Sequence, residues 1–307
     1  LHKARELIRA FPEQWTSDER ALSLAIDLGN KTSAWESLVP LAEVNSERRP
    51  DDVGAWLLRL TLDLKMCKMS RLHSTLEAVP AELTGAARLL AHVAALELRF
   101  GQAAKGMRRL YSMFRRKHED ATASSAYLVT ILGATSELPF MEDTLPKVIS
   151  GSTVSLKNDL GEVLMLSLEP EGFDDLPSKE GFYAASSETA KVLNGKTLGE
   201  KISLPGPFGS TRNFLINGIT STYRWLLQEA QKRVNSLSKS EIPILSLSVP
   251  QNDNGADFSH VHAMLKKQSE HIRHSLQIYA NGPITIGILS QLLGRNVIDI
   301  ISGWPLD

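Results

Sequence analysis

The chain has 307 residues, more than one hydrophobic core usually serves, so about two domains are expected. Its 42% hydrophobic and 22% charged residues are ordinary for a globular protein and exclude wholesale disorder or a fibrous architecture. The 34 Lys and Arg residues nearly balance the 35 Asp and Glu residues, which leaves a net charge of -1. No bulk field therefore draws the protein onto nucleic acid or an anionic membrane.

The cysteine content and hydropathy predict a cytoplasmic protein. A single cysteine, Cys67, excludes an intrachain disulfide and a cysteine-based metal site, and it favours a reducing compartment. We interpret Cys67 as an apolar residue on a helix face. No run of about 18 apolar residues is present, so no membrane span is predicted. Because the chain starts at Leu1 without Met and stops abruptly at Asp307, we interpret it as a piece of a longer protein.

Residues 1–140 are predicted to form a helical-repeat array. Apolar residues recur there at helical spacing, as in Leu72, Leu76 and Val79. The segment divides into three units of two helices each, 17–50, 51–84 and 85–120. A period of about 34 residues is typical of tetratricopeptide repeats. The glycine and aromatic positions of that consensus are mostly unfilled, so the predicted fold is a tetratricopeptide-like α-solenoid, whose groove suits a protein partner.

Residues 150–255 are predicted to form a small α+β domain, because Gly, Pro and Ser punctuate segments with period-two alternation. The predicted strands are 162–168, 201–204, 213–219 and 242–249, the last at a sheet edge because Pro243 cannot donate to a ladder. An amphipathic helix is predicted over 222–237.

Residues 256–307 are predicted to be a helical linker to a domain outside this chain. Asp257 or Ser259 caps a helix that runs to about Ala280 and stops at 281–283. A shorter helix follows over 285–293, and 296–302 makes one or two further turns.

Residues 186–223 carry a motif built from Gly195-Lys196, then Gly199-Glu200, then Pro207-Phe208-Gly209. Gly195 stops a helix, a turn at Gly199 launches a strand, and the segment 205–209 reverses the chain into a pairing strand. This pattern resembles the C-terminal domain of the transcript-cleavage factors GreA and GreB, which implies an FKBP-like fold. In that family the domain docks onto RNA polymerase, so polymerase binding is implied by analogy.

The resemblance does not imply transcript cleavage, because the family's cleavage chemistry lies on the acidic tip of an N-terminal coiled coil and this chain has no long heptad run. Its order of parts instead resembles bacterial multidomain proteins in which a PIN-type nuclease follows tetratricopeptide-like repeats and a Gre-like domain. Residues 297–302 resemble the first strand of such a nuclease, with Asp299 as its first acid. A helical turn with a solvated Asp299 is the alternative.

No metal or cofactor is predicted. His271 and His274 lie one helical turn apart on the predicted helix, but His260 is too far away to share an ion with them. The glycine-containing loops lack the ending of a phosphate loop, and no nucleophile elbow is present. We therefore predict that this chain is not an enzyme.

A basic cluster with interleaved aromatics marks the third unit. Arg108, Tyr111, Arg115 and Arg116 are the candidate patch for nucleic acid or a partner, because Arg beside an aromatic ring suits phosphates and stacked bases. The favoured interpretation is a solvated outer face of a repeat helix, and nucleic-acid binding is not expected.

The predicted function is a non-catalytic interaction and regulatory module of a bacterial multidomain protein, as the sensor or scaffold of a PIN-type RNase effector in stress or phage defence. The alternative is a transcription regulator that docks on RNA polymerase through the Gre-like domain.

Overall fold

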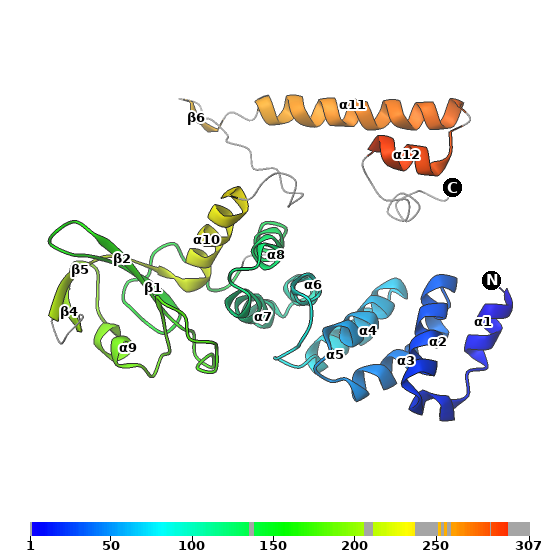
Figure 1. Cartoon of the computed structure of the whole chain (residues 1–307), viewed down its shortest axis with the longest axis horizontal. Helices are drawn as coiled ribbons and strands as arrows, with labels where there is room; N and C mark the ends of the chain where they lie inside the picture. Colours follow the sequence, from blue (N-terminus) through cyan, green and yellow to red (C-terminus); the bar gives the residue numbers. More distant parts are fainter. Residues whose placement is uncertain are drawn as a thin grey trace. The chain divides into compact units, whose positions relative to one another are not determined.

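The computed structural model describes residues 2–134, 138–205, 211–236, 251–252, 255–256, 259–282 and 284–293. The chain divides into two compact units, residues 1–244 and 245–307. In the larger unit a series of helices precedes a five-stranded sheet, and the described part of the smaller unit contains two helices (Figure 1). Among the described residues, no helix has the length and hydropathy that a membrane span requires.

The first part of the larger unit is helical, as predicted. In chain order its elements are α1 (His2–Arg9), the 3₁₀ helix η1 (Glu13–Ser17), α2 (Glu19–Thr32), α3 (Trp35–Arg48), α4 (Val53–Lys65), α5 (Met69–Ala78), α6 (Ala87–Arg99), α7 (Ala103–Arg116) and α8 (Ala121–Leu132).

The helices follow the predicted period. The three predicted units contain the pairs α2 and α3, α4 and α5, and α6 and α7. Ala42, Leu76 and Leu110, which follow one another at this period, are all 0% exposed. Equivalent positions therefore fill equivalent places in the core. The finer classification as a tetratricopeptide-like solenoid rests on this period and stays a prediction.

The same period sets where helices begin. The side chain of Asp18 accepts a hydrogen bond from the Ala21 N–H at 3.0 Å, and that of Asp52 accepts one from the Ala55 N–H at 3.0 Å. Asp120, two periods after Asp52, caps α8 in the same way. Each carboxylate satisfies an N–H that the first helical turn leaves without a partner. By this register α8 is the first helix of a fourth unit.

The sheet has the strand order β3-β2-β1-β5-β4. Its strands are β1 (Ser152–Lys157), β2 (Val163–Leu168), β3 (Phe182–Tyr183), β4 (Lys201–Pro205) and β5 (Thr211–Ser221). All neighbours are antiparallel except β2 and β3. Three of these strands, β2, β4 and β5, were predicted, but the central strand β1 was not singled out. The expected edge strand 242–249 lies outside the described residues.

Two cores stabilise the larger unit beyond the first helices. Val154, Leu156 and their neighbours form the core of the sheet, which α9 (Glu188–Leu193) covers. The helix α10 (Thr222–Ser236) follows β5 directly and packs on α8. Through Tyr223 and Leu226 it joins the main core of α4 to α8. The helices and the sheet, predicted as separate domains over 1–140 and 150–255, thus lie within one compact unit.

The smaller unit contains the two predicted helices, α11 (Ser259–Asn281) and α12 (Ile286–Leu293). They pack on each other, and the Nε2 of His271 lies 3.0 Å from the Leu292 carbonyl. A ribbon of β6 (Gln251–Asn252) and β7 (Gly255–Ala256) precedes them. The predicted turns over 296–302 lie outside the described residues.

Candidate functional site

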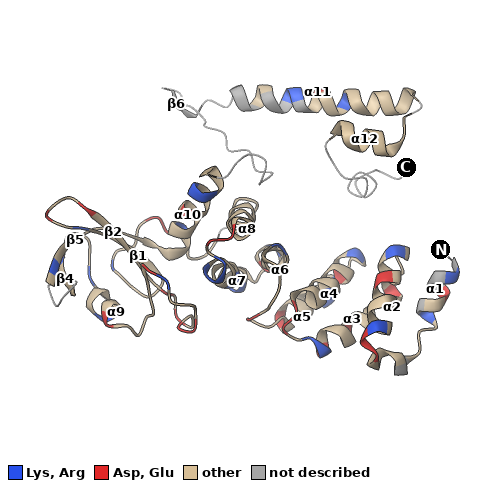
Figure 2. Ribbon diagram, viewed as in Figure 1, with Lys and Arg blue, Asp and Glu red and all other residues tan. Residues whose placement is uncertain are grey.

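Lys and Arg are frequent along α7, the helix that carries the predicted basic patch (Figure 2). Two members of the patch are buried, with Tyr111 0% and Arg115 4% exposed. Both contact the carboxylate of Glu169, just after β2: the Nε of Arg115 donates to its Oε1 at 2.9 Å, and the Tyr111 hydroxyl donates to its Oε2. The predicted solvated outer face is therefore wrong for these two residues.

The other two members lie apart from each other. Arg108 donates to the Glu171 backbone carbonyl at 2.9 Å and stacks over the Phe173 ring at 4.5 Å. Arg116 instead forms an exposed ion pair with Glu82 at 3.3 Å. Hence Arg108, Tyr111 and Arg115 fasten the segment after β2 to α7, and Arg116 faces a different part of the molecule. We call these contacts, between α7 and residues 169–173, the joint. Sequence analysis did not predict the joint, because its acceptor Glu169 is far from α7 along the chain.

The joint favours fixed protonation states. Burial, followed by the neighbouring Glu169 carboxylate, raises the pKa of Tyr111 well above its usual value, so its hydroxyl stays a donor. At the end of α7, the Nδ1 of His118 lies 2.6 Å from the Lys179 Nζ. Burial, then the charges of Lys179 and Arg233, lower the pKa of His118 to about 4.

Protonation of His118 is expected to destabilise the fold. Since its pKa in the folded chain is about 4, below the ordinary value of about 6.5, the unfolded chain binds the proton more tightly. The free energy of unfolding should therefore fall as pH drops from about 6.5 to 4, by about 1–2 kcal/mol after solvent screening of this half-buried group. Urea unfolding across this range should show a smaller slope for His118→Gln, and an unchanged slope would contradict the assignment.

Two of the turns predicted for residues 186–223, at Gly195 and at Gly199, are present. Gly195 has φ +78° after α9, and Gly199 has φ +83° before β4. The Gly199 N–H donates to the Ile216 carbonyl at 2.9 Å, which ties this turn to β5. Lys196 pairs with Glu200 at 3.0 Å on the surface. The motif's remaining residues, Pro207 and Gly209, lie outside the described residues.

Gly199→Val is expected to lower the free energy of unfolding by about 1–3 kcal/mol, because a β-branched residue is strained at positive φ. Nothing lies within 4 Å of a Cβ built there, so backbone strain alone should set the cost. Leu198→Val, at the exposed neighbouring position, is the control. Equal unfolding midpoints for the two variants would contradict the turn assignment.

The helical array has a hollow of about 490 Å³ between α6 and α8. His92 and Arg99 line it from α6, and Thr130 from α8. Elsewhere on α8 apolar side chains are uncovered: Val129 is 54% and Leu132 69% exposed, and Leu132 lines a separate hollow against α10. Arg99 also belongs to a repeated set, since Lys31, Lys65 and Arg99 occupy the last turns of α2, α4 and α6 at the period of the repeats.

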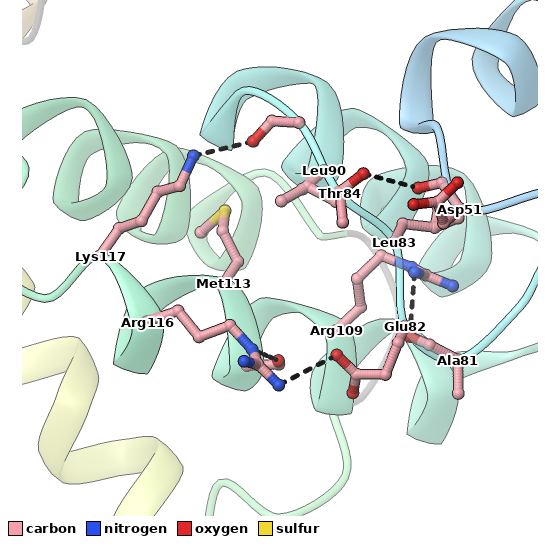
Figure 3. Close-up of a pocket in the computed structure, with 12 residues that line it drawn as sticks. Asp51, Ala81, Glu82, Leu83, Thr84, Leu90, Arg109, Met113, Arg116 and Lys117 are labelled. Atoms are coloured by element: carbon pink, nitrogen blue, oxygen red, sulfur yellow. Dashed lines mark hydrogen bonds and ion pairs between the residues drawn. The ribbon is translucent and has the colours of Figure 1, made fainter. Parts of the chain in front are cut away.

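A second pocket, of about 480 Å³, lies between α7, the start of α6 and the loop that joins α5 to α6 (Figure 3). Leu83, Leu90 and Met113 contribute apolar walls, and Arg116 and Lys117 lie at its edge. The sequence did not single out this pocket. The pocket could have been predicted from the repeat register, because that register places the charged end of α7 beside the loop after α5.

The described residues contain no group of three or more His, Cys, Asp or Glu side chains that could hold a metal ion. Cys67 is exposed and has φ +53° just after α4, so its interpretation as an apolar helix-face residue is wrong. Asp299, the candidate first acid of a nuclease, lies outside the described residues.

Comparisons with known proteins do not assign the chain to a family. No protein-family model matches it, and no curated protein matches it. Among solved structures, a GreA/GreB elongation factor from Nitrosomonas europaea is 21% identical over 31% of this chain and 76% of its own, with a TM-score of 0.23. Gfh1 from Thermus aquaticus is 17% identical over 58% of this chain and 94% of its own, with a TM-score of 0.22. At such TM-scores these likenesses carry no structural assignment.

Proposed function

We propose that this chain is a non-catalytic interaction module that binds an acidic segment of another protein along the first helices of its repeats. The supporting observation is the repeated position of Lys31, Lys65 and Arg99, all of which are exposed. Lys65 lies over the Trp35 ring at 4.6 Å and Arg99 over the Phe100 ring at 5.5 Å, and these contacts leave both cations without a neutralising carboxylate among the described residues. Such cations favour their helix termini, and they also leave a row of positive charge for a partner.

The spacing of Lys31, Lys65 and Arg99 determines how acidic side chains must be spaced on the partner. Packed helices lie about 8–10 Å apart, and an extended chain advances about 3.3 Å per residue. A peptide lying across the repeats therefore presents a side chain to each successive cation at about every third residue. The helices α4 and α6, which carry Lys65 and Arg99, pack on each other, and α2 shares a core cluster with α4.

The hollow between α6 and α8 adds an apolar requirement. Arg99 lines it together with Ala95, Leu96 and Leu98 of α6, so apolar side chains of the partner gain burial there. The partner is thus an extended segment with acids at every third residue, followed by apolar residues. Recognition of an extended peptide in a repeat groove is a common use of such arrays.

Fluorescence anisotropy with a labelled peptide tests this proposal. The probe has glutamate at every third residue and two leucines after the last, and its comparison peptide has the same composition with contiguous glutamates. We expect the probe to bind more tightly, and Lys65→Glu/Arg99→Glu to weaken it by about tenfold or more. Lys191→Glu/Lys232→Glu, which changes the net charge equally at exposed cations of α9 and α10, is the matched control. Equal losses in both variants, or no preference between the peptides, would overturn the proposal.

A second candidate is docking on RNA polymerase through the sheet, with a regulatory role in transcription. The positive φ angles of Gly195 and Gly199 and the antiparallel β4–β5 pair are the turn geometry that the Gre-like motif predicts. Binding of purified bacterial core polymerase to the immobilised chain tests it, and free Gre factor should compete. A sensor or scaffold role beside a PIN-type nuclease, in stress or phage defence, is a further proposal that rests on the order of parts in the sequence alone.

A further inference from the structure

The pocket beside α7 has walls that the chain itself holds in place. The Thr84 N–H donates to the Asp51 carbonyl at 2.6 Å, and the Val53 N–H donates to the Thr84 carbonyl at 3.0 Å. From α7, Lys117 donates to the Gly85 carbonyl at 2.8 Å. Gly85 has φ +139°, and a Cβ there would lie 2.4 Å from Val53. The loop is thus fastened at both ends of the pocket, so a ligand would not need to order it.

Arg109 fastens the near side of the same loop. Its guanidinium donates to the Pro80 and Ala81 carbonyls at 2.8 and 3.1 Å, and to both oxygens of the buried Glu97. Its charge is therefore already compensated. Arg109 therefore forms part of the pocket wall, and we do not expect its guanidinium to bind a ligand.

The interior suits an apolar group. Leu90 is 7% and Met113 3% exposed, and Leu83 is half-buried above them. The volume of about 480 Å³ lies within the range of about 300–1,000 Å³ that small-molecule pockets span. Apolar walls of this kind favour a hydrocarbon chain or a ring system over a polar ligand.

The edge of the pocket carries an exchangeable cation. Arg116 pairs with Glu82 at 3.3 Å, and their side chains are 45% and 64% exposed, so this pair contributes little to stability. A ligand carboxylate can replace Glu82 at this guanidinium. Lys117 lies on the same side and keeps N–H groups beyond the one that it donates to Gly85. Asp51 lies on the opposite side (Figure 3), where it disfavours a second negative charge.

We propose that this pocket binds a small apolar monocarboxylate, whose hydrocarbon chain lies against Leu83, Leu90 and Met113 and whose carboxylate pairs with Arg116 and Lys117. The site differs from the peptide row described above, because Leu90 is in the first turn of α6 and Arg99 is in its last. Binding here therefore stands or falls separately from binding of the acidic peptide.

Isothermal titration calorimetry of the full chain with octanoate tests the proposal. We expect saturable one-to-one binding of octanoate, weaker binding of its dicarboxylate analogue octanedioate, and no binding of octylamine. Arg116→Ala should weaken octanoate binding by about tenfold, because it removes a charge-assisted hydrogen bond. Glu82→Gln should strengthen it by about threefold, because it removes the competing carboxylate.

Two further variants separate binding from folding. Leu83→Trp should abolish octanoate binding by filling the pocket while the unfolding midpoint changes little, since Leu83 lines the pocket and is only half-buried. Lys191→Ala, which removes an exposed cation of α9, should leave octanoate binding unchanged. Absence of octanoate binding, equal affinity for octanedioate, or unchanged affinity in Arg116→Ala would each overturn the proposal.

Discussion

Glu169→Leu is expected to lower the free energy of unfolding by about 3–5 kcal/mol. Glu169 is 4% exposed, and its two oxygens accept hydrogen bonds from Tyr111 and Arg115. Removal of the carboxylate leaves the guanidinium of Arg115, itself 4% exposed, as a buried charge without its counter-ion. Urea denaturation followed by circular dichroism measures the loss.

Glu171→Leu is the matched control for this prediction. Glu171 lies two residues further along, its side chain is exposed, and only its backbone carbonyl accepts from Arg108. The control should change the free energy of unfolding by no more than about 0.5 kcal/mol, as is usual at the surface. A loss below about 1 kcal/mol for Glu169→Leu would show that the joint does not hold the helices to the sheet.

The helices could be predicted from the sequence because their signal is local. Apolar residues at helical spacing define each helix, and the recurrence that places Leu76 and Leu110 in one core is visible without a structure. The sequence also contained an unused signal for α8. The capping residues Asp18, Asp52 and Asp120 share the same register, and they mark the start of a fourth unit.

The sheet was only partly predictable. β4 and β5 follow from alternation and turn glycines, but β1 carries just two strongly apolar core residues, Val154 and Leu156. It lies at the centre because β2 and β5 both pair with it, and β5 follows it in the chain only after β2, β3, α9 and β4. Pairing between strands so far apart in the chain cannot be predicted from a local sequence pattern.

The basic patch was misplaced for the same reason. On a helical wheel Arg115 belongs with the charged face of α7, and a surface interpretation follows if nothing covers that face. The residues that cover it come from the segment after β2, where Glu169 and Phe182 meet the guanidinium. In the structure α7 is buried continuously from Arg109 to Arg115, because this helix is enclosed on several sides. The exposed cations that we propose for binding lie instead on α2, α4 and α6 and at Arg116.

Arg109→Met is expected to lower the free energy of unfolding by about 3 kcal/mol, because it strands the carboxylate of Glu97, which is 0% exposed. Lys105, whose Nζ lies 3.9 Å from Glu97, compensates that charge only in part. The double variant Glu97→Leu/Arg109→Met should recover most of the loss, since it removes both buried charges and leaves the Pro80 and Ala81 carbonyls, on a partly exposed loop, to water.

The preceding repeat supplies an internal control for Arg109. Asp63 occupies the position of Glu97 one period earlier, and it accepts from the Thr75 hydroxyl at 2.8 Å and pairs with Arg71 at 2.7 Å. Asp63 is also 0% exposed, but Arg71 is 30% exposed, so the space that Arg71→Met opens admits water, which with Thr75 should satisfy Asp63 and keep the loss to about 1 kcal/mol. Urea denaturation of the three variants tests the ranking. If the double variant were less stable than Arg109→Met, the buried pair would be stabilising in itself, and the assigned cost of a stranded Glu97 would be wrong.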